Sequence, residues 1–165
     1  MLLLVTQLIF AQEKKNIFDI GRSGTVAEAQ VFIKKEPSAV LKVNENGFSA
    51  LVLATYRGNN EVAKFLIENG SDINGNSNMG TPLMAAVVKG NNDIAKLLIE
   101  KGADLNSTDD NGTTALIYAV QFNNVELLKL LVEKKADKAK VDKQGKTAFE
   151  YAVFSENEEI MNLLK

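Results

Sequence analysis

Residues 80–106 read GTPLMAAVVKGNNDIAKLLIEKGADLN, and this stretch predicts two short helices joined by a turn. Apolar side chains recur at helical spacing over residues 83–87 and again over residues 94–98. Gly90 and Asn91 interrupt the pattern between these runs, and Gly102 ends it. The stretch is therefore expected to fold as helix, turn and helix.

The same pattern is written again on both sides of this stretch. A step of 33 residues forward from Thr81, Leu83, Leu97, Leu98, Ala103 and Asp104 lands on Thr114, Leu116, Leu130, Leu131, Ala136 and Asp137. A step of 32 residues back from Leu83, Gly90, Ala95, Leu98 and Gly102 lands on Leu51, Gly58, Ala63, Leu66 and Gly70. A fixed period of this length indicates a stacked repeat array, in which each unit buries its apolar face against the next.

The opening TPLMAA of residues 81–86 resembles the TPLHxA signature of the ankyrin repeats, and it lacks only the histidine. The resemblance covers residues 44–165, and residues 16–43 more loosely. It implies an all-α ankyrin-repeat solenoid of about five helix-turn-helix units, with the first and last acting as caps. Units one to five are expected at about residues 16–43, 44–76, 77–108, 109–141 and 142–165. The leucines expected between units are Leu51, Leu66, Leu83, Leu98, Leu116, Leu131 and Leu164.

Small polar residues and glycines mark equivalent places in the units. A hydroxyl stands where each first helix should begin and can accept from unpaired backbone N–H groups, at Ser49, Thr81, Thr114 and Thr147. Positive φ is expected at Gly47, Gly112 and Gly145 in the turns, and at Gly70 and Gly102 after the second helices. Asp72, Asp104 and Asp137 are interpreted as turn formers, as are the asparagine pairs 59–60, 91–92 and 123–124.

Three places depart from the repeat and carry their own expectations. Lys135 replaces the C-cap glycine, so that helix end should fray or close differently. The turn over residues 75–80 is one residue short and should have its own shape. In unit one, a first helix starting near Ile17 should end at residues 21–24, and Pro37 should block further helix.

The composition excludes several kinds of chemistry. The chain has no histidine and no cysteine, which rules out Ser-His-Asp and Cys-His nucleophiles, His/Cys zinc sites and thiol redox. The carboxylates near Asp109 and Asp110 do not have the spacing of a calcium loop. We therefore expect no catalytic residue, no metal and no cofactor. The net charge of −2, without a recurring Lys/Arg stripe, disfavours nucleic acid and anionic membranes as partners.

Residues 1–11, MLLLVTQLIFA, are apolar and are followed directly by the polar, charged stretch QEKKN. One interpretation is the apolar region of a secretory signal that is cleaved before Gln12, although the basic n-region is missing and Ile9 stands where a small residue is preferred. The other is an N-terminal helix that covers the first repeat. The segment is too short to span a bilayer as a helix. We favour export and expect a bacterial periplasmic or secreted protein, with a cytoplasmic location as the alternative.

The resemblance also implies where a partner would bind, because the family's contacts come from the turn tips and the ends of the first helices. On this sequence those places are Phe48, Tyr56, Arg57, Met79, Val88, Lys89, Thr113, Gln121, Phe122, Lys146 and Phe154. Tyr, Phe, Met and Arg are enriched in interface cores. Some of these side chains could instead fold back onto the adjacent repeat, and Phe122 is the main candidate because it precedes the helix-ending Asn123.

The function expected from these residues is a non-enzymatic scaffold, a monomeric array that binds another protein through its concave groove and turn tips. The alternatives are a stabilising subunit of one fixed complex and an enzyme that uses carboxylates alone. A cleft with facing carboxylates would favour the enzyme. A shallow groove with exposed aromatic side chains would favour the scaffold.

Overall fold

The computed structural model describes residues 15–165, and its regular structure over this range is ten α-helices and one 3-10 helix. The elements are α2 (Ile17–Ser23), α3 (Val26–Lys35), η1 (Pro37–Leu41), α4 (Ala50–Arg57), α5 (Asn60–Glu68), α6 (Pro82–Val88), α7 (Asn92–Glu100), α8 (Ala115–Gln121), α9 (Val125–Glu133), α10 (Ala148–Phe154) and α11 (Glu158–Leu164). Within residues 15–165, no helix has the length and apolarity needed to cross a membrane. The predictions for residues 1–11 lie outside the described range and stay predictions.

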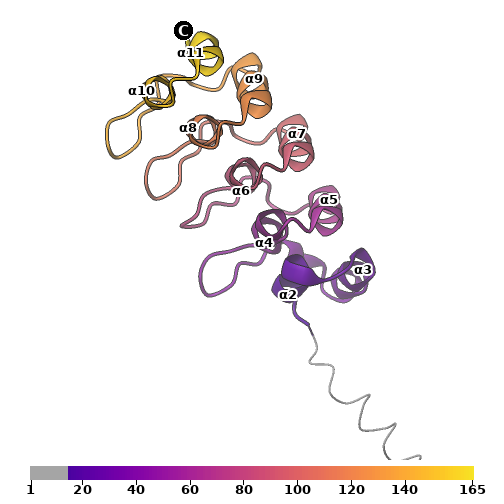
Figure 1. Ribbon diagram of the computed structural model, residues 1–165. Helices are drawn as coiled ribbons and strands as arrows, with labels where there is room; N and C mark the ends of the chain where they lie inside the picture. Colours follow the sequence, from indigo (N-terminus) through magenta and orange to yellow (C-terminus); the bar gives the residue numbers. More distant parts are fainter. Residues whose placement is uncertain (1–14) are drawn as a thin grey trace, which may run out of the picture.

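The helices form two parallel rows (Figure 1). Helices α2, α4, α6, α8 and α10 make the first row, and α3, α5, α7, α9 and α11 make the second. Each helix packs against its partner in the same unit and against the next helix in its own row. The loops that precede α4, α6, α8 and α10 project from the first row, on the side away from the second row (Figure 1). This arrangement confirms the predicted all-α solenoid.

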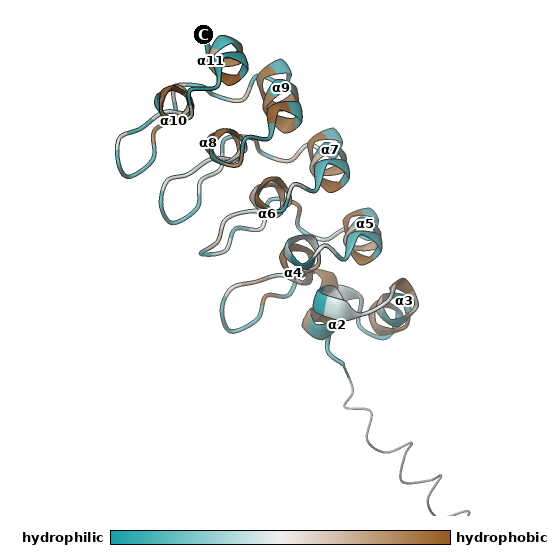
Figure 2. Cartoon of the chain, in the orientation of Figure 1, coloured by the Kyte–Doolittle hydropathy of each residue, from teal (hydrophilic) through white to brown (hydrophobic). Residues whose placement is uncertain are grey.

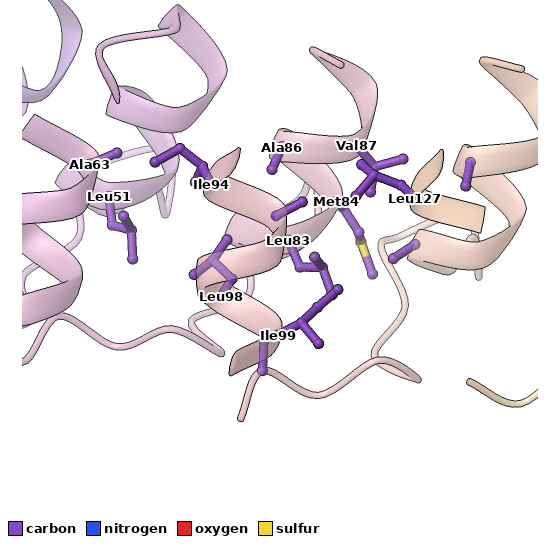
Figure 3. Close-up of a cluster of buried hydrophobic side chains, with 14 of the residues drawn as sticks. Leu51, Ala63, Leu83, Met84, Ala86, Val87, Ile94, Leu98, Ile99 and Leu127 are labelled. Carbon is purple, nitrogen blue, oxygen red and sulfur yellow. The ribbon is translucent and has the colours of Figure 1, made fainter. Parts of the chain in front are cut away.

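The core runs as a continuous row through the array. All seven leucines predicted between units are buried, with at most 5% of their surface exposed. Figure 3 shows the central part of this row, where Leu83 and Leu98 lie among apolar side chains of neighbouring units. The loops are mainly hydrophilic, whereas much of the apolar surface of the helices faces other helices (Figure 2). The apolar residues that recur about every 33 positions thus mark the face that each helix buries.

The hydroxyl caps predicted at Ser49, Thr81, Thr114 and Thr147 are all present, at the starts of α4, α6, α8 and α10. The Ser49 Oγ accepts from the Val52 N–H at 3.1 Å, and the Thr114 Oγ1 accepts from the Ile117 N–H at 3.2 Å. The equivalent bonds to Thr81 and Thr147 measure 3.4 and 3.3 Å. Each cap satisfies a backbone donor that the helix itself cannot pair. These bonds fix where the first helix starts and therefore where the preceding turn ends.

The asparagine pairs are structural, but the reason differs from the one predicted. Of residues 59–60, 91–92 and 123–124, only Asn123 takes a positive φ, of 52°. The side-chain amides instead link successive units: Asn91 Nδ2 donates to Asn60 Oδ1 at 2.5 Å, Asn124 Nδ2 to Asn92 Oδ1 at 2.8 Å, and Asn157 Nδ2 to Asn123 Oδ1 at 2.8 Å. A row of hydrogen bonds between asparagine side chains therefore runs along the array beside its apolar core.

The end of α9 closes in the same way as the equivalent helices, so the prediction that it frays or closes differently is wrong. Lys135 takes a φ of 65°, close to the 84° and 89° of Gly70 and Gly102. The Ala136 N–H then donates to the Leu131 carbonyl at 2.9 Å, as Ala103 does to Leu98 at 2.9 Å. The buried Ala136 and this bond hold the lysine backbone in a left-handed conformation that favours glycine.

Lys135→Gly is therefore expected to stabilise the protein. Relief of the left-handed strain exceeds the added entropy of the unfolded chain, so the free energy of unfolding should rise by about 0.5–1 kcal/mol. The matched control is Lys134→Gly, because Lys134 has an ordinary φ of −79° and should lose stability instead. Urea denaturation followed by circular dichroism measures both changes. Equal losses in the two variants would contradict the strain at Lys135.

Unit one differs from the prediction at its first helix. Helix α2 continues through Gly21 and ends at Ser23, and Gly21 is buried against α4. A Cβ at this position would lie 2.6 Å from the Ala50 carbonyl oxygen. The glycine therefore permits a close helix approach and does not end the helix. Pro37 was expected only to prevent further helix. After α3 ends, it instead occupies the first turn of the short 3-10 helix η1.

Candidate functional site

A groove with a volume of about 510 Å³ lies between the first row of helices and the projecting turns. Its walls come from α4, α6 and α8 and from the tips of the turns that precede them. These tips are residues 44–48, 77–80 and 109–113, and unit five has an equivalent tip at residues 142–146; each is closed by backbone hydrogen bonds. The groove thus spans units two to four, with Arg22 of unit one at its edge.

Six of the residues predicted for partner binding line this groove: Phe48, Tyr56, Arg57, Met79, Val88 and Phe122. Met79 and Phe122 are 47% and 52% exposed, while Tyr56 is half-buried. The Phe122 ring lies 6.1 Å from the Tyr118 ring, centroid to centroid, at a tilt of 41°. Phe122 therefore packs on a neighbouring aromatic ring, and about half of its surface stays exposed.

The other predicted residues lie outside the groove lining. Lys89 places its Nζ 5.1 Å from the centroid of the Tyr56 ring, beside the groove. Gln121 is exposed on α8. In unit five, the Lys146 Nζ lies 4.9 Å from the centroid of the Phe154 ring. Lys146 and Phe154 thus form a separate cation-π pair at the far end of the array.

Thr113 does not belong to a binding surface. It is 6% exposed, its N–H donates to Asp109 Oδ1 at 2.9 Å, and its carbonyl accepts from the Asp109 N–H at 3.1 Å. The expectation that Thr113 faces a partner is wrong, because the residue is buried. Its backbone N–H and carbonyl are both used in the hydrogen bonds that close the turn tip. The repeat position predicted its place along the chain but not the direction of its side chain.

Two tips are fastened by an aspartate that the sequence reading did not single out for this role. Asp109 Oδ1 accepts from the Asn111 N–H at 2.8 Å in addition to that of Thr113, and Asp109 Oδ2 accepts from the Tyr118 hydroxyl at 2.6 Å. In unit five, Asp142 Oδ2 accepts from the Tyr151 hydroxyl at 2.5 Å. The signal in the sequence is an Asp followed nine residues later by a Tyr. Each tyrosine ties its turn tip to the first helix of the same unit.

Burial and these bonds shift the ionisation of the groups involved. Burial first, and then the hydrogen bond to Asp109, raises the pKa of Tyr118 to about 12. Burial disfavours the Asp142 carboxylate, but the hydrogen bonds from Tyr151 and from the Lys146 and Gln144 N–H groups outweigh it and lower the pKa of Asp142. The Asp142 carboxylate thus stays ionised as an acceptor, while the Tyr118 and Tyr151 hydroxyls stay protonated as donors.

Alkaline titration tests the Tyr118–Asp109 bond. The pKa of Tyr118 in the folded chain lies above the value of about 10 for an unfolded tyrosine, so its contribution to stability is present below pH 10 and is lost as the pH rises towards 12. Absorbance at 295 nm should show a tyrosinate step near pH 12 that is missing in Tyr118→Phe. If the step that Tyr118→Phe removes lies near pH 10, the phenol is not held by Asp109.

Units two and three lack this fastening. Leu53 and Ala85 occupy the repeat position of Tyr118, and both line the groove. The tip of unit three is closed by Ser77, whose Oγ donates to the Gly80 carbonyl at 2.9 Å, and by the Gly80 N–H, which donates to the Ser77 carbonyl at 2.8 Å. This four-residue tip confirms that the turn has its own shape.

Comparison with known families decides what kind of array this is. The family model described as "Ankyrin repeats (3 copies)" matches residues 22–109 and 103–165. The chain belongs to the ankyrin-repeat family. The match covers every unit at least in part and confirms the resemblance carried by TPLMAA. Ankyrin repeats generally mediate protein–protein interaction, and this ankyrin-repeat chain has its groove on the side where the turn tips project.

The charged groups around the groove take part in structural hydrogen bonds or lie at its rim. Among residues 15–165, Asp109 is the one carboxylate that lines it, and both of its oxygens already accept hydrogen bonds. Asp104 holds its own turn, accepting from the Asn106 N–H at 2.9 Å, and Asp72 and Asp137 do the same, which confirms their interpretation as turn formers. Over residues 15–165, no three acidic side chains gather in a group that could hold a metal ion. Arg57 and the neighbouring Lys89 place cations beside the groove, while Asp109, Glu45 and Asp110 place carboxylates on its turn tips.

Proposed function

We propose that this ankyrin-repeat protein is a non-enzymatic scaffold that binds another protein through the groove of units two to four. The observation that carries the proposal is the exposure of Met79 and Phe122 in a groove also lined by Phe48 and Tyr56. Large apolar side chains that a folded chain leaves open to water in a concave surface are typical of a partner site. In the part of the chain that the structure describes, Asp109 is the single carboxylate that lines the groove, which favours the scaffold over an enzyme that needs two facing carboxylates.

The stabilising-subunit alternative would use the same surface. The two differ in whether the chain occurs free of its partner, since a subunit of one fixed complex should be found only within that complex. No feature of the groove favours this alternative, so we retain the scaffold as the proposed function. A partner that binds reversibly is also consistent with a groove in which half of the Phe122 surface stays exposed.

The test is the double variant Tyr56→Ala/Phe122→Ala used as bait in the native host's extract. We expect recovery of the partner to fall by about tenfold or more, because truncating two aromatic groove residues removes the side chains most enriched in binding hot spots. The melting temperature should change little, since Phe122 is half exposed. The control is Val31→Ala/Val141→Ala, which truncates two exposed apolar side chains outside the groove.

A folded double variant that still recovers the partner at the control's level would refute the groove as the binding site. A collapse of the fold would show instead that Tyr56 and Phe122 are core residues. Loss of binding and loss of folding can be distinguished with one set of purified proteins, because the melting temperature is measured on the same bait that is used for capture.

A further inference from the structure

One repeat position on the first helix holds side chains of different size in the units that border the groove. In units four and five, this position holds Tyr118 and Tyr151, whose rings reach from the first helix to the tip aspartate of the same unit. In unit three, it holds Ala85, which has no atoms beyond Cβ. Ala85 lines the groove together with Tyr118 of the next unit and Met79 of its own tip. The volume that a tyrosine fills in the neighbouring unit is therefore not filled by the Ala85 side chain, of which only 6% is exposed.

The rim near this place carries positive charge. Arg57 ends α4, is exposed and lines the groove, and the Lys89 ammonium lies over the Tyr56 ring. Arg22 also lines the groove, but its guanidinium pairs with Asp19 at 3.0 Å. Over residues 15–165, Arg57 forms no salt bridge. A chain with a net charge of −2 thus presents an unpaired cation at an apolar groove.

We propose that the groove selects an acidic, apolar segment of the partner, with one large apolar side chain seated over Ala85 and a carboxylate beside it paired with Arg57. This inference rests on the proposed function and adds the chemistry of the partner. The open position at Ala85 supplies the apolar pocket, and charge complementarity supplies the carboxylate. A basic side chain in this place is disfavoured, because it would meet the unpaired Arg57 with like charge.

Selection from a random peptide library displayed on phage, with the whole chain as target, tests this chemistry. The enriched sequences are then synthesised with a fluorescein label and titrated by fluorescence polarisation. Ala85→Tyr fills the open position with the side chain that units four and five carry there. Ala85→Leu introduces the residue that unit two has at this position, and it replaces Ala85→Tyr in the test if the tyrosine variant does not fold. Arg57→Glu reverses the rim charge, and Lys101→Glu makes the same charge change after the end of α7, outside the groove.

We expect the enriched peptides to share a large apolar residue next to Asp or Glu. Their Kd should rise by about tenfold or more with Ala85→Tyr or Ala85→Leu, and by about tenfold with Arg57→Glu, because each change removes a central contact. Lys101→Glu should change the Kd by less than about twofold. It controls for both the charge and the position, since each residue lies at the C-terminal end of a helix.

Two kinds of result would overturn the inference and are distinguishable from failure of the proposed function. Enriched peptides that lack acidic residues, or that ignore Arg57→Glu, would refute the charge preference, while loss of binding in the Ala85 variants would leave the groove as the site. Peptides that bind the Ala85 variants as tightly as the natural chain, or no enrichment at all, would refute the seat over Ala85. The proposed function would then still be decided by capture with Tyr56→Ala/Phe122→Ala.

Discussion

Leu98→Ala is expected to lower the free energy of unfolding by about 3–5 kcal/mol, one of the two largest effects we predict. Leu98 is fully buried in α7 and lies in the central row of apolar side chains (Figure 3). Unit three contacts a neighbour on each side, so a cavity there weakens two interfaces of the array at once. Urea denaturation followed by circular dichroism measures the loss.

The matched control for this substitution is the preceding residue. Leu97 is only partly buried on the same helix, so Leu97→Ala removes the same atoms from a partly solvated site. We expect its loss to be less than half of that for Leu98→Ala. Equal losses at the two positions would contradict the helix orientation that places Leu98 between units.

Gly21→Ala is expected to lower the free energy of unfolding by about 2–3 kcal/mol, although alanine is the better helix former. The added Cβ would lie 2.6 Å from the Ala50 carbonyl oxygen, and neither backbone can yield without separating α2 from α4. Hydrogen exchange should show faster exchange in unit one than in units three and four. Ser23→Ala in the same helix is exposed and should change stability little. Full stability of Gly21→Ala would contradict the close approach.

The fold could be predicted because the information for it is local and repeated. The spacing of Leu83 and Leu98 indicates the buried faces of two helices, and a hydroxyl such as that of Thr114 indicates where a helix starts. The two misjudged residues depend on tertiary contacts and hydrogen bonds that the sequence pattern does not show. Gly21 was assigned to a helix end because the approach of Ala50 is not visible from within unit one. Lys135 keeps its helix closed because Ala136 is buried and hydrogen-bonded.

The candidate site was predictable only in part, and for a related reason. The repeat position placed Tyr56, Met79 and Phe122 at the groove correctly, since the ends of first helices and the turn tips face the same side of the array. It could not show that Thr113 turns inward, because that depends on its bonds to Asp109. Ala85 was missed because a small side chain becomes informative only when the tyrosine of the next unit is seen beside it.

Site-specific photo-crosslinking in the native host's extract tests the central claim, that the groove binds another protein, most directly. The photoreactive residue is introduced by Phe122→benzoylphenylalanine in the groove and, as a control, by Glu100→benzoylphenylalanine on the exposed side of α7 in the second row. We expect a discrete crosslinked protein from position 122 and none from position 100. Crosslinks from position 100 alone would contradict this claim and place the binding surface on the second row of helices.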